Sequence, residues 1–156
     1  MFNKYMFIFD FDGTLVPQTK FTDLETNQKN FEKFKLYINP DAFNINWCIV
    51  TSRPKCDIVK LRDCLIRNQA RNYYDVYTQP YDIPKIHCVE EFEIKAKHIR
   101  SIVTYSSLIP VYVDNSKHVR DSVLDMYHKL YPSEHLMCFS MKKLMDSLLG
   151  SKQFRD

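Results

Sequence analysis

Residues 6–16 read Met6-Phe7-Ile8-Phe9-Asp10-Phe11-Asp12-Gly13-Thr14-Leu15-Val16. The apolar run stops at Asp10, which predicts a buried strand over residues 5–10 with two carboxylates at its end. Because carboxylates are costly to bury without partners, the pair indicates a compensating cation, most simply a metal ion. In an open α/β sheet ligands bind where the strands end, so we expect the chemistry of this chain at Asp10 and Asp12.

The spacing of these two acids suits a reaction site. Residues i and i+2 of an extended strand lie on one side, so Asp10 and Asp12 can face a common site. There one carboxylate can attack while the other transfers a proton. Gly13 allows the chain to leave the strand with an unusual backbone angle, and Thr14 adds a hydroxyl group at the turn. The alternative interpretation is an Asp-rich turn, which commonly follows a strand.

Two later apolar runs, residues 47–51 and 110–114, also end in polar side chains. The first ends at Thr51 and is followed by Ser52, and the second ends at Asp114. If these runs are parallel strands of one sheet, their polar ends meet the acids of the first strand at the same edge. Thr51 or Ser52 could instead cap the helix that follows, and both roles are compatible.

A lysine between these two runs is the third candidate feature. Lys95 and Lys97 lie near the start of a helix predicted over residues 94–106, and either ammonium group could neutralise a buried carboxylate. We favour Lys95, because Ile99 continues a buried stripe behind it. The alternative for each is an ordinary solvated helix lysine.

The pattern along the whole chain alternates strands with helices. Strands are predicted at residues 5–10, 47–51, 74–77, 110–114 and 136–139, and helices at 24–38, 55–68, 94–106 and 141–149, with a further helix capped by Asn115 or Ser116. This alternation predicts an α/β fold, a single doubly wound three-layer domain with a central parallel sheet. The 156 residues fit one domain, assigned to residues 1–150, with a frayed tail over 151–156.

The segment Phe9-Asp10-Phe11-Asp12-Gly13-Thr14-Leu15 resembles motif I of the haloacid dehalogenase (HAD) superfamily, most of whose members are phosphatases. Residues 47–54 resemble motif II, residues 109–115 resemble motif IV, and Lys95 stands where motif III has its lysine. The resemblance covers roughly residues 5–145. It rests on the order of four short motifs: acid pair, hydroxyl, lysine, acid.

This resemblance implies a role for each candidate residue. Asp10 would attack phosphorus and form an aspartyl-phosphate, and Asp12 would protonate the leaving oxygen and then activate water. Lys95 would offset charge as the third catalytic residue. The implied magnesium ligands are a side-chain oxygen of Asp10, the backbone carbonyl of Asp12, and Asp114. The implied substrate-binding residues are Thr14, Thr51, Ser52 and Arg53.

Two departures from the family pattern bear on the site. Where the family often has a second acid after the first in motif IV, this chain has Asn115, and Asp121 follows further on.

The segments 16–24 and 79–91 leave room only for a hairpin-like flap and a loop, so the resemblance implies a HAD-like Rossmannoid core with minimal or no cap. An open site suits a phosphate on a large molecule, such as a nucleic-acid end or a protein, although an oligomer could also cover it.

Composition and charge bear on the partners, the cellular compartment and the source of the protein. The net charge of +3 is not a strong nucleic-acid signature, although the capless module of polynucleotide 3′-phosphatases is the nearest functional analogy. Five scattered cysteines show no metal-binding spacing and predict reduced thiols in a cytoplasmic protein. No run is long enough to span a membrane. High Asn, Lys, Tyr, Phe and Ile with only 2 glycines suggests an AT-rich, viral or phage genome.

Two classes of function follow. The first is a Mg²⁺-dependent phosphohydrolase acting on a phosphomonoester such as a nucleic-acid 3′-phosphate, a nucleotide or a phosphoprotein. The second is a binding or regulatory protein on a HAD scaffold that has lost catalysis. Intact Asp10, Asp12 and Thr51 favour the enzyme.

Overall fold

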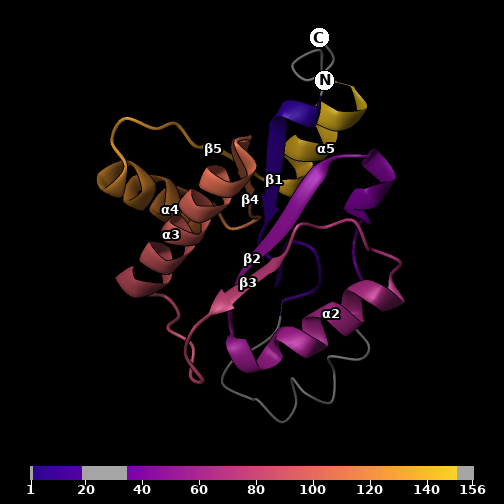
Figure 1. Ribbon diagram of the computed structural model, residues 1–156, viewed down its shortest axis with the longest axis horizontal. Coiled ribbons are helices and arrows are strands. Elements are labelled where there is room, and N and C mark those ends of the chain that lie inside the picture. Colours follow the sequence, from indigo (N-terminus) through magenta and orange to yellow (C-terminus); the bar gives the residue numbers. More distant parts are fainter. Residues whose placement is uncertain (1, 19–34, 151–156) are drawn as a thin grey trace.

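The computed structural model describes residues 2–18 and 35–150, which form an α/β fold around one five-stranded parallel sheet (Figure 1). The strands are β1 (Tyr5–Phe9), β2 (Asn46–Pro54), β3 (Val76–Gln79), β4 (Ile109–Val113) and β5 (Met137–Phe139), in the order β3-β2-β1-β4-β5. The α-helices are α2 (Ile58–Arg67), α3 (Val89–Ser106), α4 (Lys117–Leu130) and α5 (Met141–Leu149). The predicted parallel sheet is therefore confirmed.

The helices cover both faces of the sheet, as Figure 1 shows. Phe7 and Phe9 of β1 belong to the core that contains the buried apolar residues of α2 and α5. Met6 and Ile8 of the same strand pack into the second core, with α3 and α4. Alternate residues of one strand thus face opposite layers, which is the doubly wound three-layer arrangement that the sequence predicts.

The central position of β1 explains its unbroken apolar sequence. β1 pairs with β2 on one side and with β4 on the other, so Phe9 lies beside both Ile49 and Val113. A parallel strand between two others is buried on both faces and needs no polar alternation. The chain runs outward from β1 to β3 and then returns to β4. The carboxyl ends of β1 and β4 therefore flank the point where the strand order reverses, which is where open α/β sheets bind ligands.

Several boundaries differ from the sequence prediction. Helix α3 begins at Val89 rather than 94, with Glu90 and Glu91 in its first turn, where carboxylates favour the helix dipole. Strand β3 spans 76–79 rather than 74–77, and β2 continues to Pro54.

The predicted caps have mixed outcomes. Neither Thr51 nor Ser52 caps a helix, because Pro54 occupies the N-cap position of the 3₁₀ turn Lys55–Asp57, labelled η3. Ser116 caps α4 as predicted, since its side chain accepts a hydrogen bond from the Val119 N–H.

Three sequence predictions fall wholly or partly outside the described residues. The tail 151–156 lies outside them. The flap at 16–24 is described only to residue 18. The helix predicted over 24–38 is described only from residue 35, and residues 35–38 are not helical.

The connection from β3 to α3, residues 80–88, contains neither helix nor strand. The buried Gln79 side chain fixes it: its amide nitrogen donates to the Lys85 carbonyl at 2.6 Å, and its amide oxygen accepts from the Lys85 N–H at 2.7 Å. The connection is thus a short loop, as the sequence predicts. In the described ranges 2–18 and 35–150, no helix is long and apolar enough to cross a membrane.

Candidate active site

Asp10 and Asp114 lie at the ends of neighbouring strands. The Asp10 N–H donates to the Val113 carbonyl at 2.9 Å, and the Asp114 N–H donates to the Phe139 carbonyl at 3.0 Å. These bonds continue the sheet for one residue beyond β1 and β4, and they fix where both acids stand. Both are buried, with relative exposures of 9% for Asp10 and 2% for Asp114.

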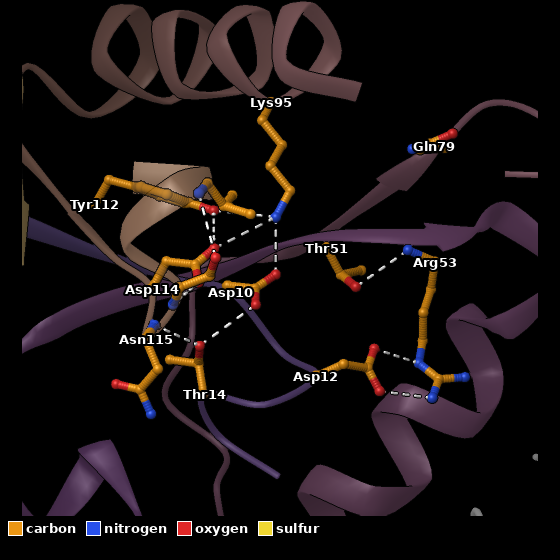
Figure 2. Close-up of polar contacts among 12 residues, drawn as sticks. Asp10, Asp12, Thr14, Thr51, Arg53, Gln79, Lys95, Tyr112, Asp114 and Asn115 are labelled. Carbon is orange, nitrogen blue, oxygen red and sulfur yellow. Dashed lines mark hydrogen bonds and ion pairs between the residues drawn. The ribbon is translucent and has the colours of Figure 1, made fainter. Parts of the chain in front are cut away.

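Lys95 reaches these acids from the buried face of α3 (Figure 2). Its Nζ lies 2.8 Å from Asp10 Oδ1 and 3.8 Å from Asp114 Oδ2. Lys97, the other candidate, is exposed and pairs with Glu93 at 2.8 Å. The structure therefore brings Lys95, and not Lys97, to Asp10 and Asp114.

The electrostatics of this group indicate a shortage of positive charge. Burial raises the pKa of Asp10 to about 7, Lys95 opposes the rise, and the charge of Asp114 adds to it. Burial lowers the pKa of Lys95, but Asp10 and Asp114 outweigh it, so the net pKa is raised and the ammonium stays charged. One cation thus serves two buried carboxylates, and a second cation would relieve Asp10.

Tyr112 is a site residue that the sequence reasoning missed. Its fully buried hydroxyl group accepts a hydrogen bond from Lys95 Nζ at 3.0 Å and donates to Asp114 Oδ2 at 2.7 Å. Burial, then the charges of Asp114 and Asp10, raise the pKa of Tyr112, so it remains a donor. Its position two residues before Asp114, on the same side of β4, is a signal that could have identified it.

Asp12 points away from Asp10 and towards Arg53 (Figure 2). Arg53 Nε donates to Asp12 Oδ2 at 2.8 Å, and its terminal nitrogen donates to Oδ1 at 2.7 Å, while the guanidinium also bonds Asp57 at 3.1 Å. Burial lowers the pKa of Arg53, but its bonds to Asp12 and Asp57 produce a net rise. This bidentate pair fixes the orientation of Asp12.

The turn after β1 is tied to the end of β4. Thr14 Oγ1 donates to Asp10 Oδ2 at 3.3 Å and accepts from the Asn115 N–H at 3.1 Å. The Asn115 side chain donates to the Gly13 carbonyl at 3.0 Å and accepts from the Met141 N–H at 2.9 Å. Gly13 has a φ of 77°, a left-handed conformation that favours glycine.

The alternatives for motif IV are separated in space. Asn115 lies beside the site, and its amide connects the turn after β1 to the start of α5. Asp121 lies on α4, is exposed, and pairs with Lys117 at 3.0 Å. Asp121 does not line the cavity described next.

A cavity of about 720 Å³ opens over the acids. The predicted site residues that line it are Asp10, Asp12, Thr51, Ser52, Lys95 and Asp114. Thr14 and Arg53 are buried behind this lining, bonded to Asp10 and Asp12. The remaining lining residues, none of which was predicted as a site residue, are Gly13, Gln18, Ile86, His87, Glu91, Ser116 and Val119.

The donor set fits a hard cation in part. Asp10 and Asp114 offer carboxylate oxygens, the ligands that Mg²⁺ prefers. In the described part of the chain, no three His, Cys, Asp or Glu side chains are grouped as a metal site. A cation here would need further oxygens, such as the Asp12 carbonyl, water or a substrate.

Comparisons with known proteins give evidence at the level of the fold. No family model and no curated protein matches this sequence. A chain in the solved structure of a Pnkp1/Rnl/Hen1 complex is similar with a TM-score of 0.60 at 16% identity, over 88% of this chain and 46% of that chain. The HAD domain of the effector protein Lem4 from Legionella pneumophila is similar with a TM-score of 0.53 at 11% identity, over 94% of both chains. The fold is HAD-like.

At these identities the likeness extends to the HAD-like fold alone. The chain spans about half of the first of these two structures. A fold by itself identifies neither a reaction nor a substrate nor a metal. The function must therefore be argued from the site itself.

Proposed function

We propose that this protein is a Mg²⁺-dependent phosphomonoesterase that acts through an aspartyl-phosphate on Asp10. The observation that carries the proposal is a buried carboxylate 2.8 Å from a lysine ammonium, at the floor of a cavity, with a pKa raised to about 7. Strongly perturbed carboxylates in a cavity are typical of reaction sites.

The residues support a two-step transfer. A carboxylate oxygen of Asp10 attacks phosphorus, the bond to the leaving oxygen breaks, and Asp12, as general acid, gives a proton to that oxygen. Water then attacks phosphorus and returns a proton to Asp12, the bond to Asp10 breaks, and inorganic phosphate leaves. Lys95, Thr51 and Ser52 would hold phosphoryl oxygens, because they line the same cavity as Asp10.

Asp10, Asp114 and the backbone carbonyl of Asp12 would hold the Mg²⁺. When bound, the ion would supply positive charge opposite the transferring phosphoryl group. The fit rests on the two buried carboxylates that share one ammonium group.

Mg²⁺ is expected to stabilise the folded protein, because the unfolded chain has no such site. At a hundredfold excess over its dissociation constant, the ion should raise Tm by roughly 5–10 °C. Asp114→Asn should lose most of this shift, whereas Asp121→Asn, an exposed acid on α4, should keep it. Thermal unfolding with and without Mg²⁺ measures this. An absent shift in the wild type, or an equal shift in Asp114→Asn, would contradict Mg²⁺ binding at this site.

Tyr112→Phe is expected to weaken Mg²⁺ binding, because it removes the hydroxyl group that orients Asp114. Groups that orient metal ligands typically contribute about 10–100-fold to metal affinity. The midpoint of a Mg²⁺ titration of Tm measures this. Tyr127→Phe is the matched control, since Tyr127 is also buried but its hydroxyl bonds Glu134 at 2.8 Å. Equal midpoints for the two variants would remove Tyr112 from the site.

A binding or regulatory protein without turnover is the second candidate. The observation that favours it is the bidentate grip of Arg53 on both oxygens of Asp12. The two bonds use about half of the roughly four acceptor positions of the carboxylate, so a proton or a water molecule could still bind there. The same contact, however, is one that an ion pair with no role in turnover would make.

Phosphate release separates the two candidates. The panel should contain an aryl phosphate, nucleotides, sugar phosphates, phosphopeptides, and oligonucleotides phosphorylated at the 3′ or 5′ end, each with Mg²⁺. We propose that the preferred member is a nucleotide, a nucleic-acid end or a phosphoprotein, because the connection 80–88, which lines the cavity with Ile86 and His87, is a short loop. No release from folded protein would favour the binding function.

A further inference from the structure

Glu91 is a buried carboxylate in the cavity that the proposed reaction does not use. It is only 4% exposed and lines the cavity with Asp10 and Lys95. Among the described residues, its side chain has no hydrogen-bond partner. No fully enclosed side-chain oxygen in the described part of the chain lacks a partner, so the Glu91 oxygens must keep some contact with the cavity.

The charge of Glu91 contributes to the raised pKa of Lys95, after the larger contributions of Asp10 and Asp114, but this charge contact gives the Glu91 oxygens no hydrogen-bond donor. Lys95, one helical turn further along α3, is already paired with Asp10 at 2.8 Å and approached by Asp114 at 3.8 Å. A third carboxylate adds negative charge where a phosphate dianion is expected to bind. The helix dipole tolerates an acid in this turn, but the exposed Glu90 has the same advantage without being buried.

The position of Glu91 on α3, one turn before Lys95, suggests a contact with the leaving group of a substrate. Residues i and i+4 of a helix lie on the same face, with about 5–6 Å between their Cβ atoms. Glu91 therefore lies beside Lys95 in the cavity lining, so a phosphoryl group held by Lys95 would place the neighbouring atoms of its leaving group near Glu91. A buried acceptor of this kind disfavours a ligand that gives it no donor, and favours one that does.

We propose that Glu91 accepts a hydrogen bond from the leaving group, so that the preferred substrates are phosphomonoesters with a hydroxyl group on the carbon next to the phosphoester carbon. This inference rests on the proposed phosphomonoesterase function. Ribonucleoside 3′-phosphates and many sugar phosphates belong to this class. Their 2′-deoxy and deoxy counterparts lack the donor.

A matched substrate pair tests the proposal. Ribonucleoside and 2′-deoxyribonucleoside 3′-monophosphates of one base differ by a single hydroxyl group. The wild type is expected to favour the ribonucleotide by roughly 10-fold or more in kcat/KM, because a site built around a hydroxyl group rejects the analogue without it. Glu91→Ala should bring the ratio close to one. Glu91→Gln keeps an acceptor oxygen of the same shape and should retain part of the preference.

Glu93→Gln is the control, because Glu93 lies on the same helix and pairs with Lys97 at 2.8 Å away from the cavity lining. In Glu93→Gln, the ratio of kcat/KM between the ribonucleotide and the deoxyribonucleotide should equal that of the wild type. Three results would overturn the proposal: no ribonucleotide preference in the wild type, an equal loss on both substrates in Glu91→Ala, or a shifted Mg²⁺ midpoint of Tm in Glu91→Ala. The second result would indicate that Glu91 acts as a charge partner of Lys95. The third would indicate that Glu91 is an outer ligand of the metal.

A binding measurement keeps this inference separate from the proposed reaction. Asp10→Asn protein with Mg²⁺ can be titrated with both nucleotides by calorimetry, with and without Glu91→Ala. A ribonucleotide preference that disappears in the double variant supports the role of Glu91 even if no nucleotide is hydrolysed, in which case the reaction alone fails. Hydrolysis or binding without such a preference overturns the role of Glu91 and leaves the reaction standing.

Discussion

Asp10→Asn is expected to abolish phosphate release, by at least roughly 10⁴-fold in kcat, because the amide oxygen is a poor nucleophile and cannot form the acyl phosphate. The fold should survive, since asparagine has the shape of aspartate and can still accept the Thr14 hydroxyl bond. The measurement is phosphate release with Mg²⁺ on the best substrate of the panel, alongside circular dichroism of both proteins.

Asp121→Asn is a suitable control for this loss. It removes the same charge from an exposed position on α4, where Asp121 pairs with Lys117, and it should turn over like the wild type. An Asp10→Asn protein that releases phosphate after removal of contaminating phosphatases would contradict the proposed nucleophile.

Lys95→Met is expected to have the second largest effect, a loss of roughly 10²–10⁴-fold in kcat. Methionine keeps much of the apolar stem but removes the ammonium group that lies 2.8 Å from Asp10. The change leaves Asp10 and Asp114 without their shared cation, so a carboxyl group should take up a proton and lose its nucleophilic form. Steady-state kinetics with Mg²⁺ measures the loss.

Lys97→Met is the matched control, two residues along the same helix. Lys97 is exposed and pairs with Glu93, so its removal should change kcat by less than about twofold. Equal losses in the two variants, or full activity in Lys95→Met, would remove Lys95 from the proposed site.

The strand ends were predictable from sequence because an abrupt stop in an apolar run is a local signal. Asp10, Thr51 and Asp114 each follow such a run, and parallel strands bring their ends to one edge of the sheet. The sequence could not choose firmly between Lys95 and Lys97. That choice depends on the rotation of α3 about its axis, which is set by the burial of Phe92 and Ala96 beneath it.

The sequence reasoning missed residues whose roles arise from tertiary contacts. Tyr112 reads as one more apolar strand residue until its hydroxyl group is seen between Lys95 and Asp114. Arg53 is a predicted substrate-binding residue, and its contact with Asp12, 41 residues away in the sequence, is a further tertiary contact that the sequence does not reveal. Glu91 was not identified from the sequence, because the predicted helix begins at residue 94 and leaves out the acidic first turn of α3.

The measurement that tests the central claim most directly is a search for the phosphoryl group on Asp10. The protein would be mixed with Mg²⁺ and its best substrate, quenched in acid within the first turnovers, digested, and analysed by mass spectrometry. We expect one phosphoryl group on the peptide that contains Asp10, and none in Asp10→Asn treated in the same way. Phosphate release by the wild type with no phosphoryl group on Asp10, or with one on another residue, would contradict the account.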